Sequence, residues 1–489
     1  MLRKSLILLA LGLFALPALG EQSGSKPADC SQLMAWVAGG VSNQQLKRRV
    51  EEHGIAFVPN AAAAKALMTA GAAPELIQTI QTSKVVPDSA DASCPPRLAL
   101  AGEMIRQKRY QEAQSILQKM VTADPGNASL HFALGYVRQQ QGDWDQAFDD
   151  YSDARDLMPS FPETHGRLAY VFYHSGDANS AIAEARTALS LDPNNAEAYR
   201  YLGLGLFANI QYSAALHAFR ESLAREPNSA EVYYDMGITL RDQRDMKGAE
   251  AAYRKAISLN PQSWEAHNNL GVLQHDLKNY DGAIAEYRQA KRLAPQEAAI
   301  RNNLGNTYCD KGDYDDAIAE FHELFKMDAG WERGHDCVAK AYMAKRDYES
   351  AIDELKLAIL QNPTGGAEHR VLGQALLLLH QDKEALHQLL IAVELDPDSP
   401  LAHHYLATAL FGAQDFERAE TEFRQAARLE PTASNHYYLA ACLMSMGRYD
   451  DAMAELEIAA RMEPSRNLYR ARKEELLKLM KASAAANLP

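Results

Sequence analysis

An alanine recurs every 34 residues through most of this chain and sets the frame of a sequence repeat. A glycine or alanine stands twelve residues before it, and in most copies a proline stands twelve residues after it. A fixed period of this length indicates stacked copies of one supersecondary unit, because each copy can bury its apolar face only against its neighbours. The column contains Ala113, Ala147, Ala181, Ala215, Ala249, Ala283, Ala317, Ala351, Ala385, Ala419 and Ala452.

Each copy contains two amphipathic windows separated by a turn, which predicts a helix hairpin. The prolines follow the second window, where the helix has to end. The repeats span residues 94–466, and residues 467–481 form a last amphipathic helix that caps the open apolar face of the stack.

These positions resemble the tetratricopeptide repeat (TPR) family. The resemblance implies an all-α fold, a right-handed α-solenoid superhelix of about eleven helix hairpins. The repeats depart from the family pattern at Ala329, which replaces a proline, and at Asp382, where an aromatic residue is usual.

Three segments precede the repeats. Residues 1–20 have a charged start, a short apolar core and a small-residue cleavage site, so they predict a secretory signal peptide. Residues 30–83 predict a small helical domain, with helices that begin after Ser42, at Asn60 and at Pro74, and with a core of Leu33, Trp36, Val50, Phe57 and Leu67. Residues 84–93 are a linker by composition.

Five cysteines are present. In an exported protein, a bridge between Cys30 and Cys94 would stabilise the fold by ~4 kcal/mol on the chain-entropy model. Two unpaired thiols are the alternative. The other three, Cys309, Cys337 and Cys442, fall on different repeat helices, and we expect no bridge among them.

The net charge of −14 disfavours nucleic acid and anionic lipid as ligands, although it also serves solubility alone. After the signal peptide no long apolar run follows, so we expect no membrane insertion of the mature chain. No phosphate loop, nucleophile elbow or metal-spaced motif occurs, and the repeats leave little room for a catalytic domain. We therefore expect no enzyme activity, no cofactor and no metal.

Histidine recurs at the fourth repeat position, where the family usually has an aromatic residue. Neighbouring copies are roughly 10 Å apart, which is too far for two of them to share one metal ion. Packing between helices is the first interpretation of this column, and a pH-sensitive column is the second. Its members are His131, His165, His267, His335, His369, His403 and His436.

In the family, the concave face of the stack is lined by residues 2, 5, 6, 9, 12 and 13 of each repeat, here called the concave positions. In this sequence they carry aromatic residues and an arginine in repeats three to five, and amides and acids in repeats six and seven. Asn269 and Asn303 resemble the asparagine ladder of O-GlcNAc transferase, whose amides can hold a peptide backbone. A solvated polar face is the alternative. The resemblance implies as partner-binding residues Tyr170, Tyr173, Arg200, Tyr201, Phe207, Tyr234, Asn268, Asn269, Asn302, Asn303, Asn306 and Asp310.

The sequence thus predicts a non-catalytic protein–protein interaction scaffold of the cell envelope, periplasmic or secreted, that holds a peptide or protein segment in the concave groove. Two alternatives stay open. One is a structural subunit of an envelope assembly or a polysaccharide-export machine, and the other is the repeat arm of a glycosyltransferase-type enzyme. The oligomeric state does not follow from the sequence.

Overall fold

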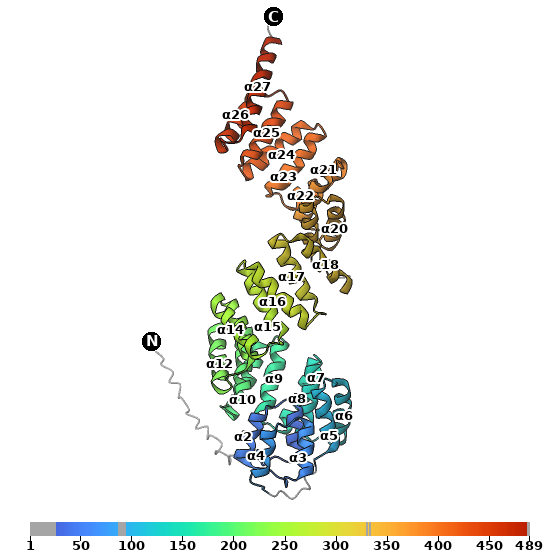
Figure 1. The fold of residues 1–489 in the computed structure, drawn as a ribbon, viewed down its shortest axis with the longest axis vertical. Helices are drawn as coiled ribbons and strands as arrows, with labels where there is room; N and C mark the ends of the chain where they lie inside the picture. The colour runs from blue at the N-terminus through green and yellow to red at the C-terminus, as the bar shows by residue number, and fades with distance from the viewer. Residues whose placement is uncertain (1–25, 87–93, 329–330, 332–333, 487–489) are drawn as a thin grey trace, which may run out of the picture. The chain divides into compact units, whose positions relative to one another are not determined.

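The computed structural model describes residues 26–86, 94–328, 331 and 334–486. Within these residues the chain forms 27 α-helices and no strand, so the all-α prediction is confirmed (Figure 1). The predicted signal peptide and residues 87–93 of the predicted linker lie outside the described residues. Contacts divide the chain into two compact units, residues 1–260 and 261–489, and each is considered by itself below.

Four short helices precede the repeats. They are α1 (Cys30–Ala38), α2 (Asn43–His53), α3 (Ala61–Ala70) and α4 (Pro74–Thr82). The last three begin where the sequence predicts, since Ser42 and Asn60 cap α2 and α3 with their side chains and Pro74 opens α4. Helix α1 is an addition to the predicted elements, and Asp29 at its start makes a capping box with Gln32.

Five helix hairpins complete the first unit. They are α5 (Pro96–Arg106) with α6 (Tyr110–Ala123), α7 (Ala128–Gln140) with α8 (Trp144–Leu157), α9 (Pro162–His174) with α10 (Ala178–Leu191), α11 (Ala196–Ala208) with α12 (Tyr212–Arg225), and α13 (Ala230–Asp242) with α14 (Met246–Leu259).

Six hairpins and a last helix form the second unit. They are α15 (Trp264–Asp276) with α16 (Tyr280–Leu293), α17 (Ala298–Lys311) with α18 (Tyr314–Met327), α19 (His335–Lys345) with α20 (Tyr348–Gln361), α21 (Gly366–Leu378) with α22 (Asp382–Leu395), α23 (Pro400–Gly412) with α24 (Phe416–Leu429), α25 (Ala433–Ser445) with α26 (Tyr449–Met462), and α27 (Asn467–Ala486).

The alanine column is the seam of every hairpin. All eleven alanines have 0% exposed surface. Opposite them, five repeats place a glycine whose missing side chain leaves space for a ring from the second helix. At Gly203, for example, an added Cβ would lie 2.4 Å from the ring of Phe219. The small residues of the 34-residue pattern therefore mark the positions where the two helices of a hairpin are too close for larger side chains.

Every turn within a hairpin contains one residue with positive φ at repeat position 15. Four repeats supply glycine there, namely Gly142, Gly176, Gly312 and Gly447. The other seven use residues with side chains, among them Ile210 at φ 59°. A residue in the left-handed backbone conformation ends the first helix of each hairpin and turns the chain toward the second helix.

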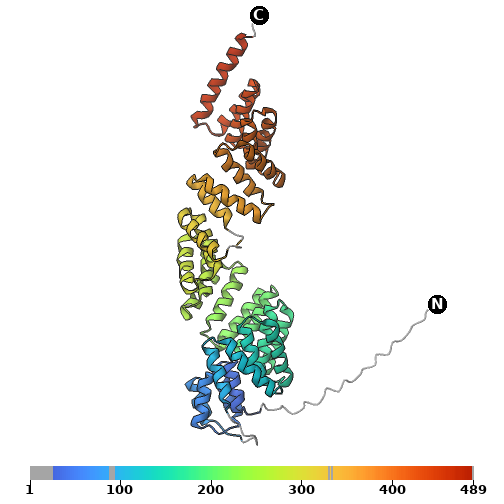
Figure 2. The same ribbon diagram turned by 90° about the vertical axis from the view of Figure 1, so that its right-hand side faces the viewer.

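The four N-terminal helices share one core with the first repeats. Helix α1 packs against α5 and α7, and α3 packs against α5. In Figures 1 and 2 the N-terminal helices, in blue, lie beside the first repeats. The predicted core residues Leu33, Trp36, Val50, Phe57 and Leu67 are all buried, in a cluster that continues to Phe161 and Val171 of the repeats. A disulfide joins Cys30, the first residue of α1, to Cys94 before α5, with their Cα atoms 5.1 Å apart. Residues 28–86 thus pack as part of the first unit.

Candidate functional site: the concave positions

The loop between α1 and α2 lies directly on concave positions of repeats two and three. The backbone of Gly39 lies against the ring of Phe132. A Cβ atom added to Gly39 would be only 2.6 Å from a carbon of that ring. Gly40, at φ 75°, makes the same close approach to Tyr136. Arg167 donates a hydrogen bond of 2.9 Å to the Gly40 carbonyl. Two glycines therefore bring this loop into contact with the first helices of the stack.

Helix α2 continues these contacts toward the loop between repeats three and four. The Gln45 side chain donates a buried hydrogen bond of 3.0 Å to Asn195, the residue that caps α11. Arg48 donates to the Asn194 carbonyl at 3.2 Å and pairs with Asp192. The chain's own N-terminal helices thus occupy part of the surface that the family uses for partners.

Buried charges hold this contact together. Arg49 lies 5.0 Å above the ring of Trp36 and 5.3 Å from that of Phe161, while the two rings stack at 4.6 Å. Burial lowers the pKa of Arg49, and burial raises the pKa of nearby Glu163 to about 7, against the opposing effect of Arg49. The contact therefore combines apolar packing with a buried arginine and a buried glutamate.

The predicted aromatic residues of repeats three and four lie next to this contact. Tyr201 is 2% exposed and accepts a hydrogen bond of 2.9 Å from Arg167, while its hydroxyl donates to Glu197 at 2.5 Å. The Tyr170 ring lies 5.1 Å from Tyr201, and burial raises the pKa of Tyr170. Tyr201 is therefore part of an internal hydrogen-bond network. Its contact with a partner protein stays a prediction.

The other predicted residues of the first zone are distributed over three repeats. Tyr173 lies beside Tyr170, with ring centroids 6.4 Å apart. Arg200 donates to Asp235 at 2.6 Å and so ties repeat four to repeat five. Phe207 packs against Tyr212 at the turn of its own hairpin, and Tyr234 packs against Tyr253. Tyr170, Tyr173, Tyr201 and Arg200 come together.

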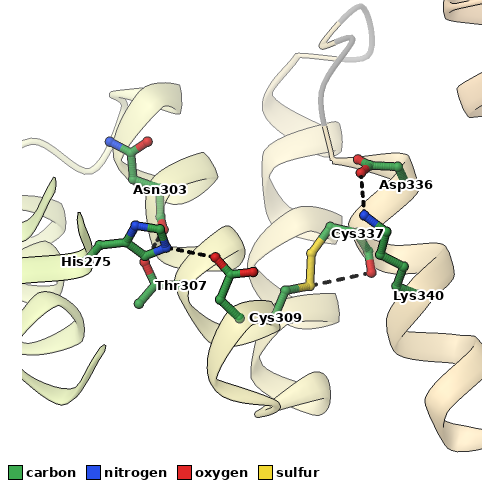
Figure 3. Close-up of a disulfide and its surroundings, with 8 residues drawn as sticks. His275, Asn303, Thr307, Cys309, Asp336, Cys337 and Lys340 are labelled. Atoms are coloured by element: carbon green, nitrogen blue, oxygen red, sulfur yellow. Dashed lines mark hydrogen bonds and ion pairs between the residues drawn. A yellow bond between two sulfur atoms is a disulfide. The ribbon is translucent and has the colours of Figure 1, made fainter. Parts of the chain in front are cut away.

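The second predicted zone lies in the second unit and is polar, as expected. Asn303 donates to the side-chain oxygen of Asn268 at 3.1 Å. His275 contacts Asp310 at 2.9 Å, a contact drawn as a dashed line in Figure 3. Asn269 and Asn302 are half-buried on the same two helices, α15 and α17. Side chains of neighbouring repeats thus already bond to one another along this row.

A polar cavity of about 390 Å³ adjoins this row. It combines Asn306 of repeat seven with Asp336 of repeat eight and Glu368 of repeat nine. The side-chain oxygen of Gln361, another lining residue, is buried and has no hydrogen-bond partner. The cavity presents carboxylate and amide oxygens, which can accept hydrogen bonds from a bound segment.

The structure corrects the expectation that the cysteines of the repeats stay unpaired. Cys309 on α17 and Cys337 on α19 form a disulfide, and their Cα atoms are 6.5 Å apart (Figure 3). The expectation rests on the three cysteines lying on different helices. First helices of successive repeats lie side by side, however, so concave position 12 of repeat seven faces concave position 6 of repeat eight within bridging range. Cys442 is free and buried.

The histidine column makes contacts between the two helices of each hairpin. In five repeats the ring Nδ1 contacts a glutamate on the second helix, nineteen residues later, at 2.5–2.6 Å. His369 contacts Gln388 in the same way, and His131 lies 3.4 Å from Asp153. The packing interpretation is thus confirmed. The glutamate column at repeat position 23 is a sequence signal for this contact that the histidine column alone does not give.

Two further observations concern membrane-spanning helices and metal ions. Among the residues that the structure describes, no helix is long and apolar enough to cross a bilayer. In the same residues, no cluster of three or more histidine, cysteine or carboxylate side chains could hold a metal ion.

Comparison with known proteins identifies the repeats. Profiles described as tetratricopeptide repeat match residues 104–203, 202–298 and 275–341. A profile of subunit 3 of the anaphase-promoting complex, or cyclosome, matches residues 389–459. The chain therefore belongs to the TPR family. A search among curated proteins gave no match.

Solved structures of other repeat proteins are similar to this chain at low identity. The PilF protein of Pseudomonas aeruginosa is 21% identical over 45% of this chain and 96% of its own, with a TM-score of 0.37. Yeast Tom70 is 16% identical over 80% and 96%, with a TM-score of 0.33. Cut9, in its complex with Hcn1, is 14% identical over 79% and 90%, with a TM-score of 0.39.

Proposed function

We propose that this protein is a non-catalytic interaction scaffold that binds a segment of a partner protein along its concave positions. One observation carries the proposal, because the chain binds such a segment in cis. Phe132, Tyr136 and Arg167 at concave positions hold the loop between α1 and α2 through ring contacts and a backbone hydrogen bond. The same surface chemistry on the remaining repeats would bind a segment in trans.

The polar row of the second unit is the part of this surface we assign to the partner's backbone. Asn268, Asn303 and Asn306 present amides, and the adjoining cavity offers the carboxylates of Asp336 and Glu368. An amide can exchange its contact with a neighbouring amide for one with a peptide group at little cost. The row therefore suits an extended segment with free N–H groups.

Site-specific crosslinking tests this function. A photoreactive phenylalanine analogue would replace Asn303 in the full chain, and in a control it would replace Lys326, whose side chain is 71% exposed on α18. We expect a protein adduct from position 303 in extracts of the source cells and none from position 326. Equal adducts at both positions, or an adduct at 326 alone, would place the partner elsewhere.

We also propose an oxidising, extracytoplasmic location. The signal-like residues 1–20 and the two disulfides support it, since disulfides persist mainly outside the reducing cytosol. N-terminal sequencing of the native protein tests it, and we expect Glu21 as the first residue. A native chain that retains Met1 and carries five free thiols would contradict this location. Within an envelope, a permanent subunit of an assembly machine is the second candidate, favoured by the apolar stripe described next.

A further inference from the structure

The first helices of repeats nine, ten and eleven present an uncharged stripe. Repeat positions 2, 6, 9 and 13 are spaced by four, three and four residues, so they lie on one face of each helix. On α21, α23 and α25 none of these positions carries a charge. We call the following five residues the apolar row: Val371, Leu378, Leu401, Tyr405 and Tyr438.

The apolar row is open to solvent and firmly supported from below. Leu378 is 46% exposed, Leu401 47% and Tyr438 40%. Val371 and Tyr405 are half-buried and pack on the core of the hairpins. The Tyr438 ring lies 6.0 Å from Phe423 and parallel to it, and His404 approaches its edge at 4.9 Å. Rings held in this way lose little freedom when a partner covers them.

The charges beside the row indicate the partner's chemistry. His404 donates to Asn435 at 3.1 Å, and burial lowers the pKa of His404, so the ring stays neutral near pH 7. Arg370 at concave position 5 is the charged group that acts on Tyr405, where it opposes the effect of burial on the tyrosine pKa. In repeats six and seven the equivalent stripe carries Asp276 and Asp310. The row therefore suits an uncharged surface with an acidic residue beside it.

The chain contains an example of such an occupant. Helix α1 is nine residues long, buries Leu33, Met34 and Trp36, and ends in two glycines that lie against Phe132 and Tyr136. Its N-cap is an acid, Asp29. In unit one, a short apolar helix thus packs against α7, the first helix of repeat two, and the loop that follows it covers concave positions 5 and 9.

We propose that the apolar row binds a short apolar helix of a partner protein, with an acidic residue placed to pair with Arg370. This inference rests on the proposed scaffold function and adds the class of partner and a second, distinct subsite. The polar row takes backbone groups, whereas the apolar row takes aliphatic and aromatic side chains that are removed from water on binding.

A labelled peptide with the sequence of residues 28–41, carrying Cys30→Ser and a helix-stabilising staple, is the probe. Its binding to the full chain would be followed by fluorescence anisotropy. We expect saturable binding that weakens at least tenfold in the variant Leu401→Asp and in the variant Tyr438→Ala. Binding by the control variant Lys326→Ala, on α18 and outside the concave positions, should be unchanged. Thermal unfolding followed by circular dichroism should be unchanged in Leu401→Asp and Lys326→Ala, because Leu401 is 47% exposed and the Lys326 side chain 71% exposed. Tyr438→Ala also loses the packing on Phe423 and should melt at a lower temperature.

The outcomes separate this inference from the proposed function. No binding of the peptide, or binding that Leu401→Asp leaves unchanged, overturns the apolar subsite even if crosslinking from position 303 succeeds. A peptide with Leu33→Asp and Trp36→Asp that binds equally well overturns the requirement for an apolar helix. If sedimentation shows a dimer that Leu401→Asp dissociates, a second copy covers the row and the proposal is wrong.

Discussion

His165 and Glu184 join the two helices of repeat three, with 2.6 Å between Nδ1 of the ring and Oε2 of the carboxylate. The other ring nitrogen lies 2.9 Å from the carbonyl oxygen of Pro159, which ends the preceding repeat. Both neighbours are acceptors, and a neutral imidazole has only one N–H. Only the protonated ring can donate to both. One side chain thereby ties together two helices of its own repeat and the end of the previous one.

We expect stability to fall as pH rises because of this contact. Burial lowers the pKa of His165, but the hydrogen bonds to Glu184 and Pro159 outweigh it, and the net pKa is raised. A raised pKa in the folded state stabilises the protein fully below the unfolded pKa of about 6.5, and this stabilisation is lost as pH rises through the folded pKa. Urea unfolding of the wild type should show lower stability at pH 8 than at pH 6.

The control for this pH dependence replaces the partner. Glu184→Gln keeps the shape and one acceptor but removes the charge, and repeat nine already has this arrangement in His369 with Gln388. The variant should be less stable at pH 6, by roughly 1–2 kcal/mol, and should lose part of the pH dependence. A variant whose stability changes between pH 6 and pH 8 as much as that of the wild type would show that His165 does not titrate as proposed.

Reduction of the second disulfide should weaken the second unit. On the chain-entropy model, a bridge across this loop of 28 residues stabilises by about 3–4 kcal/mol. Cys309→Ser should therefore lower the urea midpoint, and a reducing agent should then have less effect than on the wild type. Cys442→Ser removes a thiol that is free and should leave the effect of the reducing agent unchanged. Alkylation of three cysteines in the native, unreduced protein would contradict the Cys309–Cys337 pair.

Trp36→Ala should destabilise the first unit and uncover its concave positions. The side chain is 1% exposed, stacks on the ring of Phe161 and lies 5.0 Å from the guanidinium of Arg49. Removal of the indole leaves a cavity and leaves the buried Arg49 guanidinium without the Trp36 ring beside it. We expect the free energy of unfolding, measured in urea, to fall by about 3–5 kcal/mol. Limited proteolysis should then cut within residues 28–60 faster. Val58→Ala is the control, because Val58 is 72% exposed and should change neither measurement.

Ile210→Gly should stabilise the protein. Ile210 has φ 59°, a conformation that is strained for a β-branched residue, and it is 73% exposed. Glycine relieves roughly 1–2 kcal/mol of strain and costs up to about 1 kcal/mol in the unfolded state, so a gain of about 0.5–1 kcal/mol is expected. The reciprocal change, Gly176→Ile at φ 80°, should lower the melting temperature. Melting temperatures that move in the opposite directions would rule out strain as the cause.

Local patterns predicted most of the fold, and tertiary contacts limited the prediction of the site. The helices after Ser42, Asn60 and Pro74 follow from capping residues within a few positions of each start. The row around Asn268 and Asn303 was predicted because the repeat frame places those residues on one surface. The burial of Tyr201 was not predicted, since it depends on Arg167 and on the N-terminal helices, which have no place in the 34-residue frame.

The sequence by itself determined the repeat. The period, the buried alanine column and the turns of the repeat all depend on contacts within one helix hairpin. The same contacts form in every copy that has the same residues. Only the tertiary structure decided that α1 and α2 lie on repeats two to four, that Cys309 meets Cys337, and that repeats nine to eleven leave an apolar row open. These contacts join residues far apart in the chain, or residues of different repeats, and their free energy depends on the fit of surfaces that a one-dimensional period does not record.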